Sequence, residues 1–147
     1  MIPVISFFVD GIAKPAGSKR GFFIPKLKRV IITDACKGSK DWKTDVRLAA
    51  QRAYSGPPLT GSISLTLTFY VVRPRGHFRS GKNAAVLRDS APQFPTTRPD
   101  VLKLARGVED AMTAVIYADD SQIVDERLFK RYSPRPGCLI EIKEAGE

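Results

Sequence analysis

The chain has 147 residues, 43% of them hydrophobic, which suits one domain with a single core. Its 24 Lys and Arg against 15 Asp and Glu give a formal net charge of +9, which favours a polyanionic partner. Apolar runs are much shorter than the roughly 20 residues that span a bilayer, so we expect a soluble, cytoplasmic protein. Two cysteines, Cys36 and Cys138, are too few for a disulfide framework, and the single histidine, His77, excludes a zinc site built on histidines.

The chain opens with a strand and a cationic loop. Residues 2–10 are rich in β-branched and aromatic side chains and predict a strand. Residues 14–20 form a loop of Gly and Pro that also carries Lys14, Lys19 and Arg20. Such a loop could bring backbone N–H groups and positive charge to phosphates, and an inert turn is the alternative interpretation.

A hairpin and a helix come next. Two short apolar runs, residues 22–24 and 29–33, predict paired strands. Over residues 40–54 apolar side chains recur at the helical period, which predicts a helix with a basic stripe beside its apolar face. A solvated charged face is the simpler interpretation of that stripe, and a phosphate-facing helix is the alternative.

The clearest strand covers residues 62–72, where apolar and hydroxyl side chains alternate, and we expect it near the centre of the sheet. Residues 73–98 have little periodicity, and a segment this long without regular structure is usually functional or disordered. We expect it to be partly mobile and to become ordered on DNA. Phe78 and Phe94 could stack on bases or wedge between them, and simple anchoring of the segment is the other interpretation.

Asp100 begins the most informative stretch. Apolar residues after it recur at i, i+3, i+4 and i+7, which predicts a helix that starts at Asp100 and directs Lys103 and Arg106 away from its buried stripe. A turn with Asp119 and Asp120 follows that helix. A carboxylate at a helix start and a carboxylate pair at a turn could therefore converge.

Carboxylates beside cationic side chains have two interpretations. A capping Asp and an Asp-Asp turn are both common on protein surfaces. Alternatively, oxygen ligands from separate elements could hold Mg²⁺, which polarises a phosphodiester and activates a water. Spacing alone does not choose between the two.

Three short sequences stand in this stretch in a fixed order. They are RPDVLKLAR over residues 98–106, EDAMT over 109–113 and YADDSQIVD over 117–125. Together they resemble the signature of the RusA family of Holliday-junction resolvases, which phages and prophages commonly carry. That signature is roughly K/R-P-D-x-D-N/K-L-x-K/R, a D-A-L ending to the helix, and then D-D-S/A-Q-V/I.

The resemblance implies a homodimeric endonuclease that depends on Mg²⁺, or on Mn²⁺ in its place, and nicks four-way DNA junctions during recombination or repair. By position, Asp100 and Asp120 would bind metal, Asp119 would ligate or orient, and Arg106 would hold the scissile phosphate. A four-way junction has two-fold symmetry, which suits a symmetric dimer. The residues expected to bind DNA are Lys14, Lys19, Arg20, Arg73, Arg75, Arg79, Lys82, Arg98 and Lys103.

One position departs from the family pattern, because Leu102 stands where the family has its second acid. Glu109 would lie on the same face of the helix but roughly 10 Å further along its axis, too far to replace that acid directly. Asp110 would form an ion pair with Arg106 one turn earlier. Arg106 cannot deprotonate, so we expect it to act as a fork for phosphate.

The C-terminal part predicts two strands, residues 122–132 and 138–143, joined as a hairpin. We expect Asp125 and Glu126 to be exposed acids paired with Arg127 or Lys130, and a role beside metal ligands is the alternative. The order of elements gives an α+β fold, a single RusA-like domain over all 147 residues with a mixed sheet and two main helices.

Two other functions fit the same sequence. A junction-binding protein that has lost nuclease activity would explain Leu102, and Leu102→Asp would reveal it. A basic accessory protein would bind nucleic acid by charge alone, with no preference for junctions and a steep salt dependence. That last function leaves the Asp-Asp turn unexplained.

Overall fold

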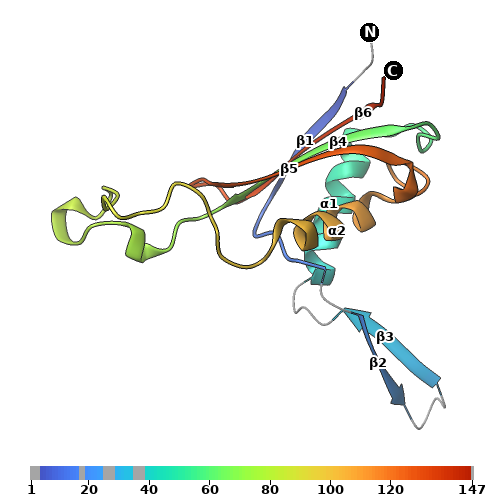
Figure 1. The fold of residues 1–147 in the computed structure, drawn as a ribbon. Coiled ribbons are helices and arrows are strands. Elements are labelled where there is room, and N and C mark those ends of the chain that lie inside the picture. Colours follow the sequence, from blue (N-terminus) through green and yellow to red (C-terminus); the bar gives the residue numbers. More distant parts are fainter. Residues whose placement is uncertain (1–3, 17–18, 25–28, 35–38, 147) are drawn as a thin grey trace.

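The computed structural model describes the backbone of residues 4–16, 19–24, 29–34 and 39–146, and the side chains of 4–16 and 41–146. A four-stranded sheet with two helices against one face forms the main body (Figure 1). This confirms the predicted α+β fold with a mixed sheet and two main helices. The sheet contains β1 (Val4–Asp10), β4 (Ile63–Val71), β5 (Ile123–Tyr132) and β6 (Gly137–Glu144), and the helices are α1 (Ser39–Ala53) and α2 (Val101–Met112).

The strand order β1-β6-β4-β5 shows that the predicted C-terminal hairpin is wrong. β4 lies between β5 and β6, so these two strands do not pair. β5 follows α2 and pairs in parallel with β4, as strands joined through a helix do, whereas β6 is antiparallel to both β1 and β4. The alternating buried residues of β6 suit an interior strand, and the charged sequence of β5 suits an edge.

The core lies between the sheet and the helices. In β4 the residues Ile63, Leu65, Leu67 and Phe69 are buried while their neighbours are partly exposed, which confirms the predicted alternation and interior position. The two helices contribute Trp42, Val46, Ala50, Leu104, Ala105, Val108, Ala111 and Met112. Cys138 of β6 is also buried as a free thiol, and burial raises its pKa.

The predicted N-terminal hairpin is confirmed as β2 (Lys19–Ile24) paired with β3 (Arg29–Asp34), which projects away from the main body (Figure 1). The cationic loop is shorter than predicted, because Lys19 and Arg20 already belong to β2, where the backbone of Lys19 is in register with that of Asp34 on β3. The side chains of Lys19 and Arg20, like Cys36, lie outside the described part.

Residues 73–98, which we call the arm, extend to the left of the body in Figure 1, in a different direction from the β2–β3 hairpin, which projects below it. As predicted, the arm has little regular structure, with only two one-turn 3₁₀ helices, at Arg75–His77 and Gly81–Asn83. The end of the arm is held against β5 by hydrogen bonds. Lys130 Nζ on β5 donates to the carbonyl oxygens of Thr97 at 2.7 Å and Pro99 at 2.9 Å.

Among the helices of the described residues, we find none whose length and apolar character would let it cross a membrane.

Candidate active site

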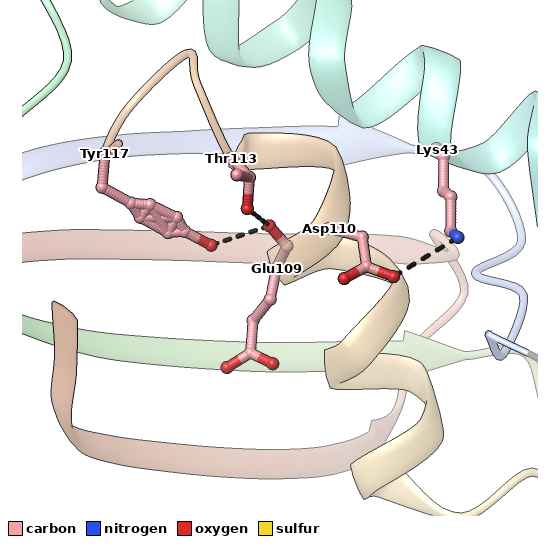
Figure 2. A network of polar contacts seen from close by, with 5 residues as sticks. All are labelled: Lys43, Glu109, Asp110, Thr113 and Tyr117. Carbon is pink, nitrogen blue, oxygen red and sulfur yellow. Dashed lines mark hydrogen bonds and ion pairs between the residues drawn. The ribbon is translucent and has the colours of Figure 1, made fainter. Parts of the chain in front are cut away.

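The C-terminal end of α2 is held by one carbonyl group. The carbonyl oxygen of Glu109 accepts hydrogen bonds from Thr113 N at 3.1 Å, from Thr113 Oγ1 at 3.0 Å and from Tyr117 Oη at 2.8 Å (Figure 2). Tyr117 is buried, so this closure is anchored in the core. The helix therefore stops at Met112, and the chain turns there toward the Asp-Asp pair.

That pair forms a fixed turn. Asp119 caps the 3₁₀ helix Asp120–Gln122, and its Oδ1 accepts from Ser121 N at 3.4 Å. The Gln122 side chain accepts from Asp119 N at 2.8 Å and donates to two carbonyls of the loop before β4. The backbone of the turn is therefore held against the sheet, while the carboxylates of Asp119 and Asp120 remain exposed.

Four acids form a group here that we call the carboxylate cluster: Glu109, Asp119, Asp120 and Glu126. A hydrogen bond between the side chains of Asp119 and Asp120 lowers the pKa of Asp119 and raises that of Asp120. Burial, followed by a hydrogen bond to Glu126 and the charges of Glu126, Asp120 and Asp110, raises the pKa of Glu109 to about 8. The structure thus brings two glutamates to the turn that the sequence analysis had not assigned to the site.

The predicted ion pairs of Asp110, Asp125 and Glu126 are wrong, because each acid has another partner. Asp110 pairs with Lys43 of α1 at 3.5 Å instead of Arg106, because it faces α1, whereas the Glu109 side chain points another way (Figure 2). Asp125 accepts from Ser64 Oγ at 3.1 Å, and the carboxyl group of Glu126 lies beside that of Glu109.

Asp100 stands at the N-cap position of α2, as predicted, but its side chain makes no capping hydrogen bond. It lines a hollow of about 590 Å³ together with three of the predicted DNA-binding cations, Lys14, Arg98 and Lys103. The loop after β1 reaches this hollow because Ala16 N donates to the carbonyl oxygen of Lys103 at 3.0 Å. Asp100 is therefore surrounded by positive charge.

The two carboxylates expected to share a metal lie at opposite ends of α2. The helix has 12 residues, which corresponds to about 18 Å. Lys130, far along β5, contacts Pro99, whereas Asp120 begins the 3₁₀ helix Asp120–Gln122 that leads into the first residue of β5, Ile123. Within a single chain Asp100 and Asp120 therefore do not converge, and Arg106 lies on the exposed side of the helix between them.

Within the described residues, no group of three or more His, Cys, Asp and Glu side chains is gathered tightly enough to hold a metal ion. The carboxylate cluster supplies only oxygen donors, which are the ligands that Mg²⁺ prefers. The type of donor therefore suits a hard divalent cation, although the spacing of the described side chains does not form a complete site.

The predicted DNA-binding residues of the arm divide into two kinds. Arg75, Arg79 and Lys82 are exposed, and Arg79 pairs with Asp89 at 3.3 Å. Arg73 is partly buried and donates from Nη1 to the carbonyl oxygen of Pro92 at 2.7 Å. Arg73 thus links the beginning of the arm to its second half, while Arg75 and Lys82 present their charge to solvent, as does the fifth predicted residue of the arm, Arg98.

Comparison with known proteins identifies the family. Residues 13–143 match the model of a family described as endodeoxyribonuclease RusA. The chain belongs to the RusA family. The resemblance noted over residues 98–125 therefore extends over most of this RusA-family chain, which places it in a family of DNA endonucleases. It is also 34% identical over 140 residues to the uncharacterized protein YqaN of Bacillus subtilis (strain 168), covering 95% of this chain and 96% of YqaN.

Proposed function

We propose that this RusA-family protein is a Mg²⁺-dependent homodimeric endonuclease that cuts four-way DNA junctions by paired hydrolysis. The observation that carries the proposal is the exposed Asp119-Asp120 turn beside Glu109, in a chain that matches an endodeoxyribonuclease family from residue 13 to 143. Such an enzyme would act on DNA in the cytoplasm, in recombination or repair of phage or host DNA.

The metal would bind at the carboxylate cluster. The neighbouring carboxylates oppose the negative charge of Glu109, and a cation would relieve that repulsion. We assign Asp120 as a ligand, Asp119 as a ligand or orienting group, and Glu109 and Glu126 as adjoining donors. When bound, Mg²⁺, or Mn²⁺ in its place, polarises a phosphodiester and activates a water.

Asp100 keeps its proposed role as a metal ligand and catalytic residue. Since it lies about 18 Å from the Asp120 end of α2, the two can serve one site only if each comes from a different chain of the dimer. A symmetric dimer would then form two such sites, which matches the two cuts that a junction needs.

The cations would position the DNA. Arg106, with its exposed guanidinium, would hold the scissile phosphate through paired hydrogen bonds. Contacts to phosphates fix register without reading sequence, which suits recognition of a junction by its shape. The remaining DNA-binding residues we propose are Lys14, Lys19, Arg20, Arg73, Arg75, Arg79, Lys82, Arg98 and Lys103.

Two substitutions test the proposal. Asp100→Asn and Asp120→Asn should each abolish cleavage of a labelled four-way junction while the protein still binds it, because each removes a ligand charge without changing side-chain size. Asp125→Asn is the matched control, since Asp125 stands close by but bonds to Ser64. Cleavage retained by both Asp100→Asn and Asp120→Asn would contradict the assignment.

A second candidate function is junction binding without cleavage, and the observation that favours it is Leu102. This side chain occupies the position of a family acid and is 67% exposed, so it is not needed for the core. Leu102→Asp should therefore fold normally. Cleavage that appears only in this variant would support the non-catalytic function, and cleavage by the unaltered protein would exclude it.

A further inference from the structure

A hollow of about 820 Å³ lies where the arm meets the end of β5, and it includes none of the acids of the carboxylate cluster. Aromatic and aliphatic side chains form most of its wall, and its polar lining consists of two arginines, Gln93 and Ser133. The larger side chains in the wall are those of Phe78, Leu87, Phe94, Tyr132, Arg73 and Arg131.

The two arginines are held against aromatic rings. The guanidinium carbon of Arg73 lies 4.3 Å from the ring centroid of Tyr132. That of Arg131 lies 5.0 Å from the ring centroids of Phe94 and Phe129. Hydrogen bonds to backbone carbonyls also fix both groups, at 2.7 Å for Arg73 and 2.9 Å for Arg131. The hollow therefore presents flat π surfaces beside positive charge.

A second, basic hollow adjoins the first and shares Phe78 with it. Arg75, Arg79 and Arg88 line this second hollow, and all three are exposed. The arm as a whole has six Lys and Arg but a single acid, Asp89, which Arg79 already contacts at 3.3 Å. An apolar hollow is thus joined to a surface that attracts anions.

We propose that the apolar hollow binds a single unstacked nucleobase of DNA and that the basic hollow binds the phosphates beside it. A nucleobase has a flat face that stacks on aromatic rings and guanidinium groups, and its backbone carries the negative charge that this surface would attract. An apolar peptide is a poorer fit, because it offers no negative charge to the guanidinium groups. Branched and bulged DNA offers such a base at the lowest cost of unstacking. The inference rests on the proposed function in taking DNA as the ligand.

Filling the hollow tests this inference. Ala85 lines it and is exposed, so Ala85→Trp should occupy the space without disturbing the core. Val86→Trp is the matched control, because Val86 is the next residue and is half exposed but does not line the hollow. We would measure equilibrium binding, in EDTA, to a duplex with one unpaired thymidine and to the same duplex fully paired.

The unaltered protein should bind the bulged duplex more tightly than the paired one, by a factor of roughly 5 to 150, which is the range for stacking one base on aromatic side chains. Ala85→Trp should lose that preference with unchanged affinity for paired duplex, and Val86→Trp should keep it. Equal binding of both duplexes by the unaltered protein, or full preference in Ala85→Trp, would overturn the inference.

Photocrosslinking provides a second measurement that needs no variant. Iododeoxyuridine at the unpaired position should crosslink to Phe78, Phe94 or Tyr132, and crosslinks found only elsewhere would overturn the inference. Because neither assay uses cleavage, a protein that shows this pattern but never cuts would contradict the proposed function alone. If the protein cuts junctions but Ala85→Trp keeps the preference for the bulged duplex, only the inference that the hollow binds a base would be contradicted.

Discussion

The carboxyl groups of Glu109 on α2 and Glu126 on β5 lie close enough to share a hydrogen bond. Two carboxyl groups can share a hydrogen bond only if one of them carries a proton. Burial is the main reason that the Glu109 pKa rises to about 8, and the nearby acids add to it. The native protein should therefore hold a proton on Glu109 at neutral pH, which has consequences for stability and for metal binding.

Glu109 should make the protein less stable as the pH rises. Between the ordinary pKa of 4.5 and the native value of about 8, the native state binds a proton that the unfolded state releases. The free energy of unfolding should thus fall through this window. Glu109→Gln should remove that fall and be more stable than the unaltered protein at about pH 9, by about 1 to 2 kcal/mol after allowance for screening of a half-buried group.

Urea unfolding of both proteins at about pH 6 and about pH 9 would measure this difference. Asp125→Asn, on the same strand as Glu126, should keep the pH dependence of the unaltered protein. A Glu109→Gln protein with that same dependence would show that Glu109 does not hold the proton.

Magnesium should stabilise the protein and displace that proton. A cation among the carboxylates favours their charged forms, so binding should release protons and raise the melting temperature. The gain should be on the order of 2 to 3 kcal/mol at about a hundredfold excess over Kd, and EDTA should reverse it. Calorimetry in buffers of different ionisation enthalpy would measure the protons released. If Asp120→Asn responded to Mg²⁺ as the unaltered protein does, the metal would bind elsewhere.

Mixing two inactive variants should restore cutting if Asp100 and Asp120 meet across a dimer. A mixed dimer of Asp100→Asn and Asp120→Asn would then contain one site with both acids intact. We expect single nicks in the mixture and none with either variant alone. A mixture as inactive as its components, with subunit exchange shown separately, would mean that each chain uses its own two acids.

The ion pair between Lys43 and Asp110 should stabilise the contact between α1 and α2 modestly. Its atoms are 3.5 Å apart, and the two side chains remain 20% and 38% exposed. Asp110→Asn should therefore lower the free energy of unfolding by about 0.5 to 1 kcal/mol without affecting junction binding. Asp45→Asn, an exposed acid on α1, should change it less. A loss much above this range would show that Asp110 has a further structural role.

Local patterns in the sequence predicted most of the fold. The strict alternation over residues 62–72 identified β4, and helical spacing identified α1 and α2. The prediction of a C-terminal hairpin was wrong because strands that are neighbours in the chain commonly pair with each other. The position of β6 in the sheet depends instead on β1, some 130 residues earlier. No local pattern carries that long-range choice. The charged sequence of β5 could have indicated an edge strand.

The candidate site was predictable only in part. The Asp-Asp turn follows from its residues, but the contact between Glu109 and Glu126 depends on how α2 packs on β5. Helical geometry correctly placed Glu109 far from position 102, without indicating what it would face instead. The separation of Asp100 from Asp120 likewise follows from the course of α2 across the sheet. Convergence of two loops is a tertiary property that sequence spacing does not determine.

The proposed function is tested by cleavage of a fixed, labelled four-way DNA junction by the unaltered protein, compared with a matched duplex, in Mg²⁺ and in EDTA. We predict paired nicks near the crossover in Mg²⁺, none in EDTA and none in the duplex. Tight binding of the junction without cleavage, or cleavage that persists in EDTA, would contradict the proposed Mg²⁺-dependent endonuclease.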